Sequence, residues 1–176
     1  MSGGGAMRIG DLVELQGDLR QQAMEIERRA FSHPWSLADF DCVVADGRAI
    51  NLALWCGAEL GGYAMAFAEG AVLHVVSLAV DEPYRRRGWG SLLVEELLRR
   101  GAARSCRICR LEVRRSNRAA QGLYGRCGFA AAGVEPGYYT RPAEDALVLE
   151  RFIEPAADAG GRLAGCPAAS ARRTSR

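Results

Sequence analysis

The spacing of apolar residues predicts helices near the start of the chain. Leucine, methionine and isoleucine recur at roughly helical intervals between residues 11 and 30, and Asp11 is a residue type that often caps a helix N-terminus. This pattern predicts two short helices, over residues 11–22 and 23–30. A further helical turn is predicted to follow Ser36, because Asp39 stands three residues later, as in a capping box.

The rest of the chain alternates between strand and helix patterns. The predicted strands cover residues 49–56, 62–68, 72–80, 107–113, 129–134 and 144–153. The predicted helices cover residues 88–100 and 116–127. Glycine-containing connections join the first three strands, which indicates an antiparallel meander. Because a helical crossover joins parallel strands, the later elements predict an α/β (α+β) domain whose mixed sheet contains at least one parallel pair.

Length and composition fit one domain. A chain of 176 residues with 49% hydrophobic content can bury a continuous core, which we expect to span residues 7–154. The Gly-rich residues 1–6 and the Ala/Gly/Pro/Ser-rich residues 155–176 hold too little apolar side chain to offset the entropy of ordering, so both are expected to be disordered. The sequence has neither a membrane-length apolar stretch nor a signal-peptide layout, so we expect a soluble, cytoplasmic protein.

Charge and cysteine content give no sign of nucleic acid, membrane or metal. The formal net charge is only +2, and the basic run at residues 85–87 has no interleaved aromatic residues. Cys106 and Cys109 form a C-x-x-C without a second pair or a nearby histidine, so no metal site is expected. The six cysteines form no dense framework, which is typical of reduced thiols. His33 and His74 are far apart and are expected to be ordinary loop or sheet residues.

A glycine-rich segment lies between the strand at residues 72–80 and the helix at residues 88–100. Unpaired backbone amides at a helix start attract phosphate, and Gly88 and Gly90 would let a pyrophosphate approach the backbone. The preceding arginines add charge-assisted hydrogen bonds. The alternative is a solvated turn in which the glycines only bend the chain. The segment does not match the G-x-G-x-x-G of a dinucleotide-binding loop, and it is not a P-loop, since the chain contains no lysine.

Residues 85–90 match the [Q/R]-x-x-G-x-[G/A] signature, and with it the chain resembles the GNAT superfamily of acetyltransferases. Five further blocks resemble its RimI-type branch: AMEIERRAFSHPWS (23–36), LAVDEPY (78–84), LEVRRSN (111–117), LYGRCGF (123–129) and GYYTRPAEDAL (137–147). Together they cover most of residues 23–150. The resemblance implies the GNAT fold, in which a mixed central sheet of about six or seven strands is flanked by helices and splayed at the acetyl-CoA site.

The resemblance also implies acetyl-CoA as co-substrate, without a metal. The backbone of the splayed strand would bind pantetheine like an added strand, the signature segment would bind the pyrophosphate, and an Asn at a helix start would bond the pantetheine arm. The implied cofactor-binding residues are Leu78, Ala79, Val80, Arg86, Arg87, Gly88, Trp89, Gly90, Ser91 and Asn117. Asn117 is also a favourable helix cap, and the two roles are compatible.

Glu112 is an acidic residue within an otherwise apolar strand pattern. An ionised carboxylate there would be unfavourable unless it faces a wet cleft. It either faces solvent, pairs with Arg110 or Arg114, or has a chemical role. Amine attack on a thioester needs a base and an acid. The resemblance implies that Glu112 deprotonates the acceptor ammonium, through water, and that Tyr124 protonates the coenzyme A sulfur.

Two features bear on Tyr124. A tyrosine on a helix is commonly a packed core residue, so that interpretation stays open. Gly122 and Gly125 lie within its helix, each destabilising it by about 0.8 to 1 kcal/mol relative to alanine. Close packing against the cofactor or the sheet would explain such small residues.

Only the sequence blocks that flank the signature segment indicate which acceptor is acetylated. They resemble enzymes that acetylate the N-terminal alanine of a small-subunit ribosomal protein, with Trp35 and Tyr138 or Tyr139 lining the peptide groove. The alternatives are another protein N-terminus, a small amine, or a non-catalytic module that binds coenzyme A. The presence of both Glu112 and Tyr124 argues against the last. Neither a nucleic acid nor a membrane is expected as a partner.

Overall fold

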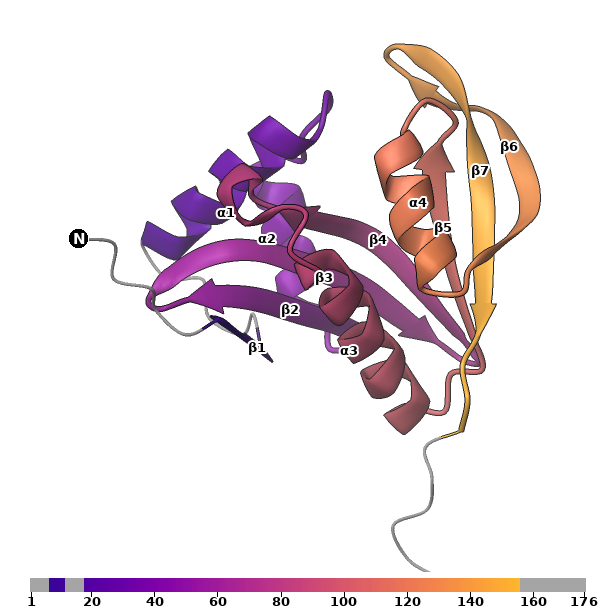
Figure 1. Ribbon diagram of the computed structural model, residues 1–176, viewed down its shortest axis with the longest axis horizontal. Helices are drawn as coiled ribbons and strands as arrows, with labels where there is room; N and C mark the ends of the chain where they lie inside the picture. Colours follow the sequence, from indigo (N-terminus) through magenta and orange to yellow (C-terminus); the bar gives the residue numbers. More distant parts are fainter. Residues whose placement is uncertain (1–6, 12–17, 156–176) are drawn as a thin grey trace, which may run out of the picture.

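The computed structural model describes residues 7–11 and 18–155. They form a seven-stranded sheet in the order β1-β2-β3-β4-β5-β7-β6 (Figure 1). The strands are β1 (Met7–Asp11), β2 (Ala49–Cys56), β3 (Glu59–Glu69), β4 (Val72–Val80), β5 (Ile108–Arg114), β6 (Ala130–Thr140) and β7 (Ala143–Phe152). The helices are α1 (Asp18–Ala30), α2 (Leu37–Ala45), α3 (Trp89–Ala103) and α4 (Arg118–Arg126), with a short 3-10 turn, η1 (Glu82–Tyr84). Only β4 and β5 pair in parallel, so the predicted mixed sheet is confirmed.

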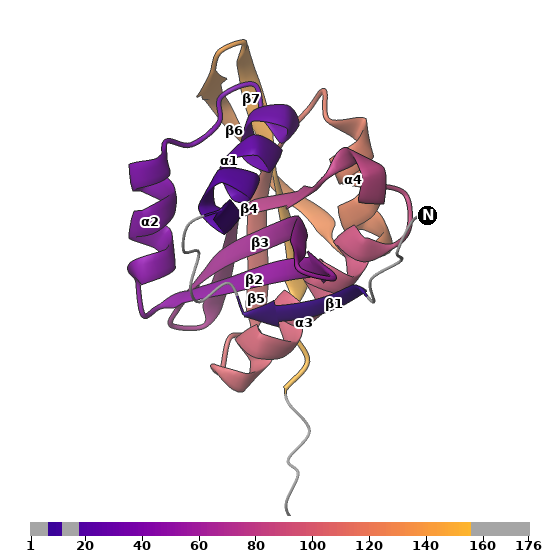
Figure 2. The same cartoon turned by 90° about the vertical axis from the view of Figure 1, so that its left-hand side faces the viewer.

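The helices cover both faces of the sheet (Figure 2). On one face, α3 and α4 bury a cluster that includes Leu73, Leu93 and Leu111. On the other, α1 and α2 bury a second cluster around Phe40 and Tyr63, whose rings meet edge to face. Each face of the sheet therefore has its own core. Among the described helices, none is both long and apolar enough to cross a bilayer.

The start of the chain differs from the prediction. Met7–Asp11 is a strand paired antiparallel with β2, so Asp11 is not a helix cap. One continuous helix, α1, replaces the predicted second helix and the end of the first. The edge of β2 offers unpaired backbone groups, and pairing with it overrides a weak helical pattern. Residues 12–17, the predicted leader at 1–6 and the predicted tail beyond residue 155 lie outside the described residues.

The capping box before α2 is confirmed. The Ser36 side chain accepts a hydrogen bond from the Asp39 amide, and the Asp39 carboxylate accepts one from the Ser36 amide. These bonds satisfy two backbone donors that a helix start leaves unpaired. The helix continues to Ala45, beyond the single turn that was predicted.

The strands β4 and β5 separate partway along their length. Their parallel ladder joins residues 72–75 to residues 108–111, after which the two strands continue without pairing to each other (Figure 1). Each keeps its outer neighbour, β3 for β4 and β7 for β5. The sheet is therefore splayed, as the resemblance implied, and one edge of each strand is open toward the gap.

A bulge in β4 lies where the splay begins. Opposite β3, Val75 pairs with Ala66 and Ser77 with Met65, which leaves Val76 without a direct partner. The extra residue reverses the alternation of side chains. Before it, Leu73 and Val75 point into the α3 core, whereas after it Leu78 and Val80 do so. The bulge thus decides which β4 side chains face each side of the gap.

Candidate active site

Two cavities adjoin the separated strands. The carboxylate cavity, of about 370 Å³, contains Glu27 and Glu112 among its lining residues. The arginine cavity, of about 460 Å³, contains Arg85, Arg86 and Arg126. Leu78, Ala120 and Tyr124 line both. The two cavities therefore meet where β4 faces α4, and a molecule in each would come together beside Tyr124.

The arginine cavity surrounds the N-terminus of α3. Gly88 is the N-cap residue in the left-handed region, with φ of 87°, and no side chain caps this end of the helix. A Cβ atom built on Gly88 would meet nothing within 4 Å, and the first residues of α3 line the cavity. Free amides at a helix start carry partial positive charge and bind anions. Arg85 fixes the loop by donating from Nε to the Val80 carbonyl at 2.8 Å.

Gly90 has a packing role in addition to the predicted one. A Cβ atom there would lie 3.1 Å from Leu123 Cδ2, a side chain of α4. Gly90 therefore permits close packing of α3 against α4, and it also lines the arginine cavity, so its role toward a pyrophosphate stays a prediction. Trp89 is partly buried and packs against the α3 core.

The predicted cofactor residues are distributed over both cavities. Most line the arginine cavity, namely Leu78, Val80, Arg86, Gly88, Trp89, Gly90 and Ser91. Ala79 points into the opposite core, Arg87 is exposed outside the lining set, and Asn117 lines the carboxylate cavity. Asn117 also caps α4, since its Oδ1 accepts from the Ala120 amide at 3.0 Å. The capping role is confirmed.

Sequence reasoning missed the contribution of α4 to the arginine cavity. Ala119, Leu123 and Arg126 line it from one face of this helix, at the i, i+4, i+7 spacing that could have identified them. Within the described part of the chain, neither Arg86 nor Arg126 has a hydrogen-bond or ion-pair partner. Both guanidinium groups are available to an anion in this cavity.

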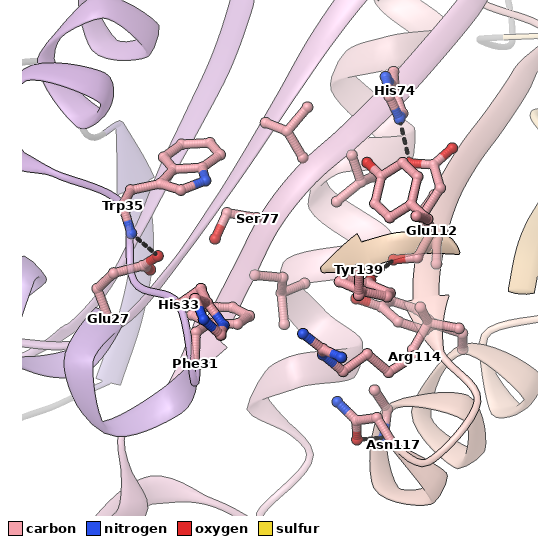
Figure 3. A pocket seen from close by; sticks show the side chains of 18 residues that line it. Glu27, Phe31, His33, Trp35, His74, Ser77, Glu112, Arg114, Asn117 and Tyr139 are labelled. Atoms are coloured by element: carbon pink, nitrogen blue, oxygen red, sulfur yellow. Dashed lines mark hydrogen bonds and ion pairs between the residues drawn. The ribbon is translucent and has the colours of Figure 1, made fainter. Parts of the chain in front are cut away.

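Glu112 lies on β5 just beyond the end of the parallel ladder, with 13% of its side chain exposed. Its Oε2 is 2.6 Å from His74 Nε2 (Figure 3). The arginines that were alternative partners are occupied, Arg110 by Glu150 and Arg114 by Glu144, both across the ladder on β7. Glu112 therefore neither faces bulk solvent nor pairs with these arginines, and it lines the carboxylate cavity.

Tyr124 is buried on α4, and its ring packs against Phe129 with centroids 5.6 Å apart. Burial raises the pKa of its hydroxyl above the ordinary value of 10.0. A phenol at neutral pH is then fully protonated and able to donate. Tyr124 belongs to the core, which confirms the packed-core interpretation, and it also lines both cavities, so its role as an acid stays a prediction.

The two glycines of α4 are not explained by crowding. A Cβ atom on Gly125 would meet nothing within 4 Å, and one on Gly122 only the end of Arg126, at 3.5 Å. The structure thus contradicts the expectation that packing against the sheet requires small residues at these positions, while packing against the cofactor stays a prediction.

A buried acid forms the opposite wall of the carboxylate cavity. Glu27, 2% exposed, accepts a hydrogen bond from the Trp35 amide at 3.0 Å and another from the Tyr63 hydroxyl (Figure 3). The Tyr63 hydroxyl is in turn 3.2 Å from Ser77 Oγ. Burial raises the pKa of Glu27, and the bond from Trp35 opposes that rise. Sequence reasoning passed over Glu27, although its place four residues after the apolar Ala23 put it on the buried face of α1.

The hairpin of β6 and β7 closes the cavity beside Glu112. Tyr138 and Tyr139 line it from β6, and burial raises the pKa of both hydroxyls. The Arg114 guanidinium stacks 3.9 Å from the centre of the Tyr139 ring and donates to the carbonyls of Arg141 and Pro142. Arg114 thus anchors the turn of the hairpin to the end of β5. Trp35, Tyr138 and Tyr139, predicted to line one groove, do line the same cavity.

No group of three or more His, Cys, Asp or Glu side chains that could hold a metal ion occurs among the described residues. Cys109 is buried, which raises the pKa of its thiol to about 12 and makes it a poor nucleophile or ligand at neutral pH. The chemistry available here is that of a carboxylate, an imidazole and phenols.

Comparison with known proteins gives consistent matches. Residues 20–129 match the model of the acetyltransferase (GNAT) family. The chain is 33% identical over 129 residues to the [ribosomal protein bS18]-alanine N-acetyltransferase of Salmonella typhimurium, covering 72% of this chain and 86% of that protein. It is 32% identical over 139 residues to the N-alpha-acetyltransferase RimI of Mycobacterium tuberculosis, covering 74% and 85%. The crystal structure of the ribosomal-protein-S18-alanine N-acetyltransferase from Escherichia coli is similar, with a TM-score of 0.76 and 32% identity, covering 89% of this chain and 99% of that one.

Proposed function

Because the chain belongs to the acetyltransferase (GNAT) family, we propose that it transfers the acetyl group of acetyl-CoA to the N-terminal α-amino group of a protein. The acceptor we propose is the N-terminal alanine of ribosomal protein bS18, which the names of the relatives specify for those enzymes. The observation that carries the proposal is the meeting of the two cavities at Tyr124, with Glu112 in one and the free amides of α3 in the other. A ribosomal-protein acceptor would place the reaction in the cytoplasm.

The arginine cavity has the features that acetyl-CoA requires. A pyrophosphate is anionic, and the open amides at Gly88, Trp89 and Gly90 together with the unpaired Arg86 and Arg126 supply donors of the opposite charge. The open edge of β4 at residues 78–80 supplies backbone groups for the amides of the pantetheine arm, as a neighbouring strand would. Bound acetyl-CoA supplies an activated acyl group.

Glu112 is the general base in this proposal. The acceptor amine is an ammonium ion at neutral pH and must lose a proton before it can attack a carbonyl carbon. Glu112 presents a carboxylate to the cavity from β5, one residue beyond the ladder that ends at Leu111. Its position on a strand, which is more rigid than a loop, suits a group that must stay in register with a bound amine.

Tyr124 is the proposed acid. It lines both cavities, and its hydroxyl is in the protonated form because burial raises its pKa. When the thioester carbon–sulfur bond breaks, the sulfur takes up a proton, and the hydroxyl can donate one. Asn117, which lines the acceptor side, has its Oδ1 engaged in capping, so its Nδ2 group is the one left to donate to a ligand.

The acceptor peptide would enter the carboxylate cavity between the Trp35 loop and the β6–β7 hairpin. Aromatic side chains at Phe31, Trp35, Tyr138 and Tyr139 border this route. Such rings provide apolar surface with hydroxyl or indole donors at their edges. A short peptide N-terminus with a small first side chain fits this setting.

Intact-mass analysis of candidate acceptors tests the proposal. The purified enzyme is incubated with acetyl-CoA and a peptide copying the N-terminus of bS18, beside the same peptide already acetylated at its α-amino group. We expect one acetyl group on the free peptide and none on the blocked one. The matched variant Glu112→Gln keeps the shape of the side chain and should reduce turnover by about 10²- to 10⁴-fold, the usual contribution of a positioned base. Acetylation of polyamines or aminoglycosides but of no peptide would refute the proposed acceptor.

A further inference from the structure

The imidazole of His74 is the partner of the proposed base. We propose that His74 is a positioning residue for Glu112: it donates from Nε2–H to Oε2 and so leaves the other carboxylate oxygen directed at the acceptor amine. This rests on the function proposed above. His74 lines the carboxylate cavity and not the arginine cavity, and its hydrogen bond is to Glu112.

The direction of the hydrogen bond follows from the chemistry of the two groups. The His74 Nε2 and Glu112 Oε2 atoms are 2.6 Å apart, within the range of a strong charge-assisted bond. An ionised carboxylate can only accept, so Nε2 must carry the proton. In a neutral imidazole the second nitrogen, Nδ1, is then without a proton. With 34% of its side chain exposed, His74 has its outer edge at the solvent.

The contact crosses the gap at the point where the strands separate. His74 pairs with Arg110 in the ladder, and Glu112 lies two residues further along β5. This diagonal relation across neighbouring strands is within reach of a long side chain. Because His74 precedes the bulge at Val76, it faces the carboxylate cavity rather than the α3 core.

A neutral donor suits a base better than a guanidinium does. An arginine beside a carboxylate favours its charged form and thereby weakens it as a base. The two arginines nearest in sequence, Arg110 and Arg114, are held by Glu150 and Glu144. His74 is the remaining partner of Glu112. A neutral imidazole can fix the rotamer of Glu112 without placing a positive charge beside its carboxylate.

The first test is the variant His74→Ala with chemical rescue. We expect kcat for the peptide acceptor to fall by about 10- to 100-fold, part of what a positioned base contributes, with the KM for acetyl-CoA unchanged. Added imidazole should restore activity, since the vacated site lies in a partly open cavity. Addition of 1-methylimidazole should not, because its neutral form has no N–H to donate. Measurements at about pH 8.5, well above the ordinary histidine pKa of about 6.5, keep both compounds neutral.

A matched control comes from the other histidine. His33 lines the same cavity, but its Nδ1 lies 3.3 Å from Ser32 Oγ. Whatever activity His33→Ala retains, it should not respond to imidazole. Wild-type activity in His74→Ala, absence of rescue, or equal rescue by 1-methylimidazole would each overturn the proposal.

A second measurement does not depend on activity or on the folding of His74→Ala. The chain contains only two histidines, so ¹⁵N spectra of the imidazole nitrogens can be assigned with His33→Ala. The neutral His74 ring should be the Nε2–H tautomer, and an Nδ1–H tautomer would contradict the hydrogen bond. Wild-type enzyme that acetylates no peptide would refute the proposed function, whereas the tautomer would still decide whether His74 donates to Glu112.

Discussion

Alanine at Gly122 and Gly125 should stabilise the protein. Both positions lie in α4, are exposed, and leave room for a Cβ atom. A glycine inside a helix is less stable than alanine by about 0.8 to 1 kcal/mol, and somewhat less near the end, where Gly125 lies. The double variant should gain about 1.5 kcal/mol. For a protein of this size 1 kcal/mol corresponds to about 2–4 °C, so Tm should rise by about 3–6 °C.

The matched control is the same substitution in α3. A Cβ atom on Gly101 would lie 2.8 Å from Leu73 Cδ2, inside the buried core. Overpacking of this kind destabilises by about 1–3 kcal/mol, which exceeds the helix gain of about 1 kcal/mol. Gly101→Ala should therefore lower Tm. Calorimetry and urea unfolding measure both changes. If both variants moved Tm in the same direction, the room for a Cβ atom at each glycine would not determine how the substitution changes stability.

Three further predictions concern the site. Tyr124→Phe should lower kcat less than Glu112→Gln does, because a thiol of ordinary pKa near 8.5 leaves readily as thiolate. Calorimetry should show unchanged affinity for acetyl-CoA. A weaker affinity would mark the hydroxyl as a binding group. Arg126→Ala should weaken acetyl-CoA binding about tenfold, the effect of one lost charge-assisted bond, and less at high salt; an unchanged Kd at low salt would exclude Arg126 from the anion site. Burial raises the pKa of Glu27 above its ordinary 4.5. The protonated side chain therefore contributes to the free energy of unfolding below pH 4.5, and this contribution is lost as the pH rises through the pKa of Glu27 in the folded protein. Glu27→Gln still accepts the hydrogen bond from the Trp35 amide. Its Tm relative to wild type should therefore increase as the pH rises from 4.5 to neutrality. Parallel curves of Tm against pH for the two proteins would contradict the raised pKa.

Much of the fold was predictable because its signals are local. The predicted bounds of β2 and β4 agree with the structure at both ends, since each is a mainly apolar run followed by Gly57 or by Asp81. The helix starts at Ser36 and Asn117 were predictable because caps use side chains within three residues. The strand β1 was not, because its stability comes from pairing with β2 some forty residues later.

The same distinction applies to the site. The loop at Gly88 is contiguous in sequence, so a motif identifies it. The partners of Glu112 and Glu27 are not contiguous, since His74 is 38 residues from Glu112 and Tyr63 is 36 from Glu27. From the sequence, His74 was expected to be an ordinary loop or sheet residue, and only the fold brings it to Glu112. Long-range pairs of this kind have no local pattern.

The separation of β4 and β5 also bears on how the protein unfolds. The units β1–β4 and β5–β7 share a hydrogen-bonded ladder only at residues 72–75 and 108–111, so opening one unit breaks few backbone bonds to the other. Apolar side chains of both units also meet in the α3 core, and hydrogen exchange would show whether the units open separately or together. A ligand that contacts both β4 and α4 crosslinks the two units, and a hundredfold excess over its Kd adds about 2.7 kcal/mol to the free energy of unfolding. Under the proposed function, the survival of the folded enzyme depends on the supply of acetyl-CoA as well as on its own sequence.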